Sequence, residues 1–196
     1  MVETITPVVH GGRKKEYWVS VALHTLGATI AAAVFGLLLG GIGALTRAPW
    51  GRVGATIVAV IATMYAVREA FGLRIPLPDR HAQVPQWWRD FFSAPVSSFL
   101  YGAGLGIGYF TFLRFGTYVA VSVAAFLVGD PLIGMLICLP FGLTRGLTVI
   151  LTANATEPAD AGGLVDILDR WGSTPWPRLL NALALGCVAV AAFLVI

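Results

Sequence analysis

The stretch from Ala94 to Gly129 reads APVSSFLYGAGLGIGYFTFLRFGTYVAVSVAAFLVG and holds one charged residue, Arg114. A straight helix of about 36 residues would rise roughly 54 Å at about 1.5 Å per residue. The hydrocarbon core of a bilayer is only about 30 Å thick. We therefore predict two helices here, over residues 95–113 and 115–129, which meet near Arg114.

The composition extends this interpretation to the whole chain of 196 residues. Hydrophobic residues make up 57% of the sequence and charged residues 12%, whereas soluble domains carry about 25% charge. A surface so poor in charge must face lipid over much of its area. Further apolar stretches long enough to cross a bilayer cover residues 18–45, 51–71, 132–152 and 176–196. The sequence predicts an all-α, polytopic transmembrane bundle with five or six spans and a Gly-rich broken helix at 94–129.

Charge placement predicts the orientation in a prokaryotic plasma membrane. The tail 1–16 carries three basic residues, and the connection that contains the loop 73–93 carries Arg68, Arg74, Arg80 and Arg89. Both are therefore expected on the cytoplasmic side. The loop 153–175 is mainly acidic; six spans place it outside, whereas five would place it inside. We expect six, with residues 17–196 as a single transmembrane domain. The net charge of +3 is small and sits near helix ends, so no nucleic acid is expected as a partner.

Tryptophans lie near the ends of the predicted spans, where indole rings settle at the headgroup level. They are Trp50, Trp87, Trp88, Trp171 and Trp176. Residues 87–92, with sequence WWRDFF, indicate a short interfacial helix that leads into the third span.

Glycines four residues apart recur within the apolar stretches and favour close helix packing, because they leave room for a neighbouring backbone. They are Gly36 and Gly40; Gly102, Gly104, Gly106 and Gly108; and Gly142 and Gly146. A glycine at every second position from 102 to 108 exceeds what one packing stripe needs. The alternative is a broken helix whose backbone lines a path through the membrane.

Polar residues inside the apolar stretches are candidates for a substrate path. An intramembrane arginine costs several kcal/mol unless it is paired or reaches the interface, and hydroxyl groups near a helix break satisfy freed backbone groups or contact a substrate. The candidates are Arg114, Arg145, Thr111, Thr117, Tyr118, Asp130 and His24. Neither a catalytic constellation nor a metal or cofactor motif is found.

The two cysteines, Cys138 and Cys187, lie far apart in separate apolar stretches. A redox pair requires Cα atoms within about 7 Å of each other, which the sequence alone does not decide. Each thiol also suits ordinary packing inside a membrane helix.

Two stretches resemble the superfamily of CcdA-type membrane thiol reductases and LysE-type small exporters. The first is His24-Thr-Leu-Gly-Ala-Thr, followed by Gly36 and Gly40; the second runs from Phe99 to Thr111 and continues at Gly116-Thr-Tyr. The resemblance implies three-helix repeats that open on a long broken helix. The Pro-Cys element of CcdA-like proteins has no counterpart in residues 108–116, so only the architecture is carried over.

These observations leave three functions open. The main prediction is a transporter or permease-like protein for a small solute. An arginine at the end of a half-helix suits an anionic solute. The second is a membrane thiol–disulfide or cytochrome c maturation component. The third is a non-catalytic partner or assembly subunit of a membrane complex, with glycine stripes that pack against another membrane protein or a second copy. In each case the lipid bilayer is a partner.

Overall fold

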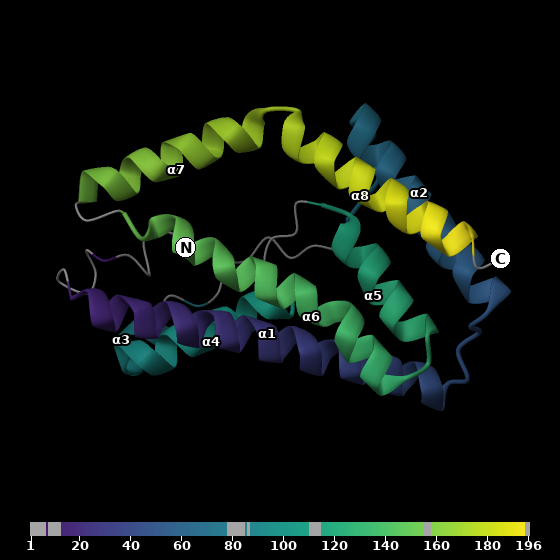
Figure 1. Ribbon diagram of the computed structural model, residues 1–196, viewed down its shortest axis with the longest axis horizontal. Helices are drawn as coiled ribbons and strands as arrows, with labels where there is room; N and C mark the ends of the chain where they lie inside the picture. The colour runs from purple at the N-terminus through teal and green to yellow at the C-terminus, as the bar shows by residue number, and fades with distance from the viewer. Residues whose placement is uncertain are drawn as a thin grey trace.

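The computed structural model describes residues 7, 13–77, 85, 87–109, 115–154 and 158–194. All elements in these ranges are helical, which confirms the predicted all-α class. They are α1 (Lys14–Leu45), α2 (Arg52–Phe71), α3 (Trp88–Phe91), α4 (Ala94–Gly106), α5 (Thr117–Leu127), α6 (Pro131–Leu147), η1 (Thr148–Thr152), α7 (Pro158–Ser173) and α8 (Trp176–Phe193) (Figure 1).

Within the described ranges, four helices are long and apolar enough to cross a bilayer. They are α1, α2, α6 together with η1, and α8. Large apolar side chains on their outer faces are exposed, such as Leu38, Val60 and Leu136. Contiguous apolar surface of this kind is rare on soluble monomers, so these helices indicate a membrane protein.

Helix α1 lies between α4 and α6 and packs closely against both. Along α6, Gly40 approaches Asp130, Gly36 approaches Gly134, and Thr25 approaches Gly146. The numbers rise on one helix as they fall on the other, so α1 and α6 are antiparallel. A Cβ atom on Gly36 would collide with the carbonyl oxygen of Gly134, which means that the two backbones are nearly in contact.

The interface between α1 and α4 is built in the same way but runs in parallel. Gly102 of α4 lies against the carbonyl group of His24, and Gly106 lies against that of Ala28. Because both numbers rise together, α4 points in the same direction as α1.

Helix α5 continues in this direction and does not turn back along α4. The rings of Phe35 and Tyr118 stack with centroids 6.1 Å apart, near the start of α5. At its other end, the carbonyl oxygen of Phe126 meets Gly43. Thus α4 and α5 follow α1 one after the other as two halves of an interrupted helix.

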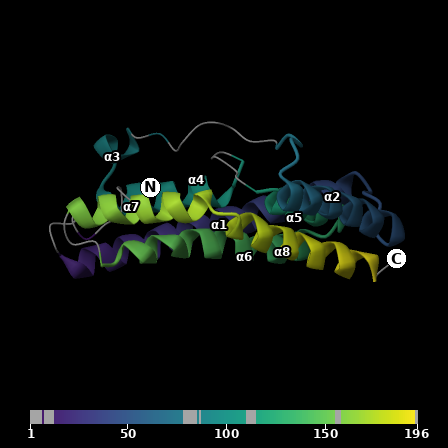
Figure 2. The same ribbon diagram turned by 90° about the horizontal axis from the view of Figure 1, so that it is seen from above.

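The remaining long helices, α2 and α8, pack against each other and against α5 at the end of the molecule that carries the C-terminus (Figure 2). Their common core contains Ala62, Tyr65, Ala120 and Leu185. Helix α7 precedes α8 and packs against it, and Figure 1 shows a bend between the two.

The structure can be compared with the predictions at three segments: α4 with α5, α7, and α3. Helices α4 and α5 have 13 and 11 residues and are shorter than the predicted spans 95–113 and 115–129. Helix α4 ends before Gly108, whose φ of +70° is a left-handed conformation that glycine adopts without strain. The predicted loop 153–175 contains α7, and the short helix predicted at 87–92 is present as α3.

Two adjacent glycines of α1 provide a matched test of this packing. We expect Gly40→Ala to destabilise the protein by roughly 1–3 kcal/mol, because the new Cβ atom would collide with the carbonyl oxygen of Asp130. Gly41→Ala should be neutral or slightly stabilising, because its nearest neighbour, Cγ of Pro131, is 3.9 Å away. Thermal unfolding of the two variants in the same detergent, followed by circular dichroism, measures the difference; equal midpoints would contradict the packing.

Candidate functional site

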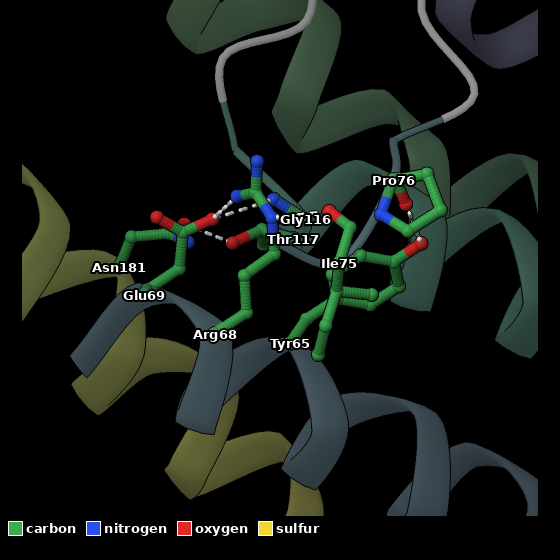
Figure 3. Close-up of polar contacts among 8 residues, drawn as sticks. All are labelled: Tyr65, Arg68, Glu69, Ile75, Pro76, Gly116, Thr117 and Asn181. Atoms are coloured by element: carbon green, nitrogen blue, oxygen red, sulfur yellow. Dashed lines mark hydrogen bonds and ion pairs between the residues drawn. The ribbon is translucent and has the colours of Figure 1, made fainter. Parts of the chain in front are cut away.

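A buried polar cluster lies where the C-terminal end of α2 meets the beginning of α5 and the first turns of α8 (Figure 3). Apolar helices bring these groups together, so each polar group needs a partner within the protein. The cluster consists of Tyr65, Arg68, Glu69, Gly116, Thr117 and Asn181.

Glu69 is the centre of the cluster and is 5% exposed. Its Oε1 atom forms an ion pair with the guanidinium group of Arg68 and accepts a hydrogen bond of 3.4 Å from the backbone N–H of Gly116. Gly116 is the N-cap residue of α5. A carboxylate at this position stabilises a helix, because the helix N-terminus carries partial positive charge.

Arg68 and Tyr65 bind the chain that follows α2. The Nε atom of Arg68 donates a hydrogen bond of 2.8 Å to the carbonyl oxygen of Ile75. The hydroxyl group of Tyr65 donates one of 3.3 Å to the carbonyl oxygen of Pro76. The same end of α2 therefore fixes its own following segment and the start of α5 (Figure 3).

Thr117 and Asn181 connect α5 to α8. The Thr117 hydroxyl donates to the side-chain oxygen of Asn181. The Asn181 Nδ2 atom is buried and has no hydrogen-bond acceptor in the part of the chain that the structure describes. Such a buried donor costs about 1–3 kcal/mol.

Tyr118 faces an aromatic cluster beside the interruption between α4 and α5. Its ring stacks on Phe141 at 4.0 Å and lies 5.0 Å from the ring of Tyr109. Its hydroxyl group donates a hydrogen bond of 2.8 Å to the carbonyl oxygen of Ile107. This carbonyl group follows α4 directly, so the tyrosine satisfies a backbone group near the helix break.

Arg145 and Asp130 occupy separate parts of α6. The guanidinium carbon of Arg145 lies 5.5 Å from the centre of the Phe141 ring, a cation–π arrangement. Asp130 is the N-cap residue of α6 and accepts a hydrogen bond of 2.9 Å from the Ile133 N–H. Fifteen residues of helix separate the two side chains, about 22 Å, so they do not form an ion pair.

His24 lies in the interface between α1 and α4, away from the polar cluster. It is 2% exposed, and its Nδ1 atom is 3.3 Å from the carbonyl oxygen of Ser98. Its Nε2 atom is buried without a hydrogen-bond partner among the described residues. Two other predicted path residues, Thr111 and Arg114, lie outside the described residues.

The structure also shows the surroundings of the two cysteines and of the remaining glycines that the sequence analysis named. Cys138 is buried where α6 faces Gly36, Cys187 is exposed on α8, and both are free thiols. Gly104 is half-buried within α4. Gly142 lies against Ala28. Gly108 lies against the Tyr118 ring, so its lack of a side chain makes room for that ring.

Sequence reasoning missed the acidic centre of the cluster. Glu69 follows Arg68 in the last turn of an apolar span, where charged residues usually mark the solvated end of a helix. The sequence feature that could have identified Glu69 is an acidic residue directly after a basic residue inside a predicted span. Asn181, an amide inside an apolar stretch, carried a similar signal. The described residues contain no group of three or more His, Cys, Asp or Glu side chains that could hold a metal ion.

Comparison with known proteins gives one consistent name. The chain is 32% identical to methylamine utilization protein MauF of Paracoccus versutus over 151 residues, which cover 76% of this chain and 55% of the relative. Identity to MauF of Paracoccus denitrificans is 30%, over 78% of this chain and 56% of the relative. Identity to MauF of Methylophilus methylotrophus is 35%, over 64% and 45%.

The chain spans about half the length of these curated relatives. No protein-family model and no solved structure matches it.

These relatives correct two predictions. The resemblance to CcdA-type reductases and LysE-type exporters is wrong, because the matching proteins are consistently named MauF. Glycine-rich apolar helices occur wherever membrane helices pack closely, so the pattern did not identify a family. The transporter function is also wrong; the relatives agree better with the alternative of a partner or assembly subunit.

The exposed ion pair between Arg13 and Glu16 provides a control for a test of the buried pair between Arg68 and Glu69. We expect Glu69→Ala to cost roughly 3–5 kcal/mol of stability, because it leaves a partly buried guanidinium group without its carboxylate. Glu16→Ala removes the Arg13–Glu16 pair, whose side chains are 69% and 49% exposed, and should cost less than about 1 kcal/mol. Thermal unfolding in detergent measures both; similar losses would contradict a structural role for Glu69.

Proposed function

We propose that the chain is a non-catalytic membrane subunit of a methylamine utilization system, where it assists the assembly or positioning of other proteins. The observation that carries this proposal is the consistent similarity to proteins named methylamine utilization protein MauF. The partner itself is a membrane-associated protein of that system.

The internal contacts support a scaffolding role. Helix α1 is fixed between α4 and α6 by contacts between backbones. The polar groups of the cluster join chain segments: Glu69 caps α5, and Arg68 and Tyr65 hold the residues after α2. Side chains engaged in this way stabilise one arrangement of the helices, which suits a subunit that presents fixed surfaces to a partner.

In the proposed arrangement the chain crosses the plasma membrane five times. The parallel course of α4 and α5 along α1 supports this count, because two successive full spans would run in opposite directions. The interrupted helix then counts as one crossing, alongside α1, α2, α6 with η1, and α8. Five is one of the two counts that the sequence left open.

The orientation follows from the basic residues that begin α1. With Lys14 and Lys15 on the cytoplasmic side, α1 leads outward, α2 inward, the interrupted helix outward and α6 inward. Helix α7 then begins on the cytoplasmic side, and α8 leads outward. The contacts of α8 support this direction. Asn181 meets Thr117, and Leu185 and Ala120, which lie farther along both helices, belong to one core cluster.

Labelling of single cysteines in intact cells tests the five crossings. In the background Cys138→Ser and Cys187→Ser, a membrane-impermeant maleimide should label Thr46→Cys, between α1 and α2, under either count. Asn154→Cys, between η1 and α7, should be labelled only after the cells are opened. Labelling of Asn154→Cys in intact cells would favour six crossings.

Growth and uptake together test the assisting role. In a host that carries this chain, deletion of its gene should abolish growth on methylamine as the nitrogen source and leave growth on ammonium unchanged. Uptake of labelled methylamine into the deletion cells should persist, because the chain does not carry the solute. Unimpaired growth of the deletion strain on methylamine would refute the proposal. Loss of methylamine uptake would contradict it as well, because it would indicate that the chain carries the solute.

A further control uses the packing variants. A gene copy with Gly41→Ala should restore growth, whereas Gly36→Leu, which places a side chain against the backbone of Gly134, should not. Membrane levels of both variants are measured by immunoblot, so that loss of function is separated from loss of protein.

A further inference from the structure

Helix α7 runs along the length of the molecule, over the same part as the first half of α1 (Figures 1 and 2). It follows η1, where the hydroxyl groups of Thr152 and Tyr17, near the beginning of α1, lie 3.3 Å apart. It leads into α8, which meets the first turn of α5 through Asn181. In that turn, Tyr118 stacks on Phe35 of α1. The bend between α7 and α8 therefore lies near the middle of α1.

Together, α7 and α8 cover the length that α1 covers alone. Helix α1 has 32 residues, whereas α7 and α8 have 16 and 18. At about 1.5 Å per residue, each path rises about 50 Å. The hydrocarbon core of a bilayer is about 30 Å thick. A bilayer centred on α1 therefore contains the bend near its midplane, together with roughly the last ten residues of α7.

One face of α7 carries charges and glycines and points away from the rest of the described chain. Its positions 162, 163, 166, 169, 170 and 173 follow the period of a helix face, and all six are exposed. Leu164 and Leu168, on the other side of the helix, are half-buried. A helix in contact with lipid would be turned the other way. The acidic face, as it is called below, consists of Gly162, Gly163, Asp166, Asp169, Arg170 and Ser173.

Lipid is an unfavourable environment for the acidic face. Asp166, Asp169 and Arg170 form no ion pair among the described residues. Charged side chains at hydrocarbon depth are costly, and they face a protein interior or a water-filled cavity. Long lysine and arginine side chains can reach the headgroups, but an aspartate side chain is too short to do so. The two carboxylates therefore need a polar partner at their own depth.

A second copy of the chain does not provide this partner. Two copies joined through the acidic face, about an axis along the membrane normal, would place each residue at the height of its own equivalent. Asp166 and Asp169 would then oppose the same two carboxylates, and like charges repel. A lysine or arginine from a different protein would instead pair with them.

The glycines show how closely such a partner can approach. No described atom lies within 4 Å of the place where a Cβ atom of Gly162 or Gly163 would be. Both glycines lie on the acidic face, one turn before Asp166. Small residues on a membrane helix allow a neighbouring backbone to come close, so this part of α7 offers free space for the packing of another helix.

We propose that the acidic face of α7 binds a transmembrane helix of another protein, which carries lysine or arginine at the depth of Asp166 and Asp169. This inference rests on the proposed function, because it assigns the surface through which the subunit contacts its membrane partner. The contact lies within the cytoplasmic half of the bilayer, where α7 begins, and it ends at the bend into α8.

Photo-crosslinking in intact cells tests this proposal. Ser173 is replaced by benzoylphenylalanine in a host that carries this chain, with expression from the chain's own gene. Irradiation should join the chain to one other protein, and mass spectrometry should place the attachment within a transmembrane helix, one or two turns from a lysine or arginine. The same replacement at Leu183, which is 67% exposed on α8, should give no cross-link to that protein.

Three outcomes of this experiment would overturn the proposal. Absence of a protein cross-link at position 173 would show that lipid or water covers the acidic face. Attachment to a second copy of the chain would show a homo-oligomer, and attachment to a segment without basic residues would show a different kind of partner. The cross-link is read in cells supplied with ammonium, so its failure is distinguishable from failure of the growth test of the proposed function.

A pair of variants tests the charge of the contact. Asp166→Asn combined with Asp169→Asn should lower the yield of the cross-link at position 173 severalfold, because the basic side chain of the partner loses its counterions. Asp160→Asn makes the same change in the first turn of α7, off the acidic face, and should leave the yield nearly unchanged. Immunoblots of the membranes confirm equal amounts of the variants. An undiminished yield in the double variant, or an equal loss in Asp160→Asn, would contradict recognition by charge.

Discussion

The arrangement of the helices depends on the near contact between the backbone of α1 and the backbones of α4 and α6. Lipid tails are as apolar as the helix surfaces, so association within a membrane relies on close van der Waals packing and on hydrogen bonds. Glycine provides the closest packing, and it lies at the crossing points on all three helices. Once α1, α4 and α6 are fixed, the position of the interruption and the direction of α5 follow.

The interruption between α4 and α5 is stabilised by one side chain of α5 itself and by one of α2. A broken helix exposes carbonyl groups at one end and N–H groups at the other. The Tyr118 hydroxyl satisfies the carbonyl group of Ile107, and the Glu69 carboxylate accepts from the N–H group of Gly116. The second of these groups belongs to α2, so the packing of α2 and α8 on α5 also supports the shape of the α4–α5 segment.

Sequence reasoning predicted the helical class, and it placed α1, α2 and α8 closely because charges, glycine or proline bound their apolar runs. It did not predict where α4 ends, because the apolar pattern continues through residues 107–116 and the helix end depends on partners remote in sequence. Glu69 was missed for the same reason: its acceptor role appears only when α5 is adjacent. The family was misjudged because the glycine pattern reports close packing, which unrelated membrane proteins share.

The adjacency of Arg68 and Glu69 has a consequence for biosynthesis. Gly116 follows Glu69 by 47 residues, and ribosomes add about 5–20 residues per second, so the helix that Glu69 caps emerges roughly 2–9 s later. During this interval the carboxylate already has a counterion in the preceding residue. The nascent α2 therefore carries a neutralised pair, and the later arrival of α5 completes a contact whose first half is encoded locally.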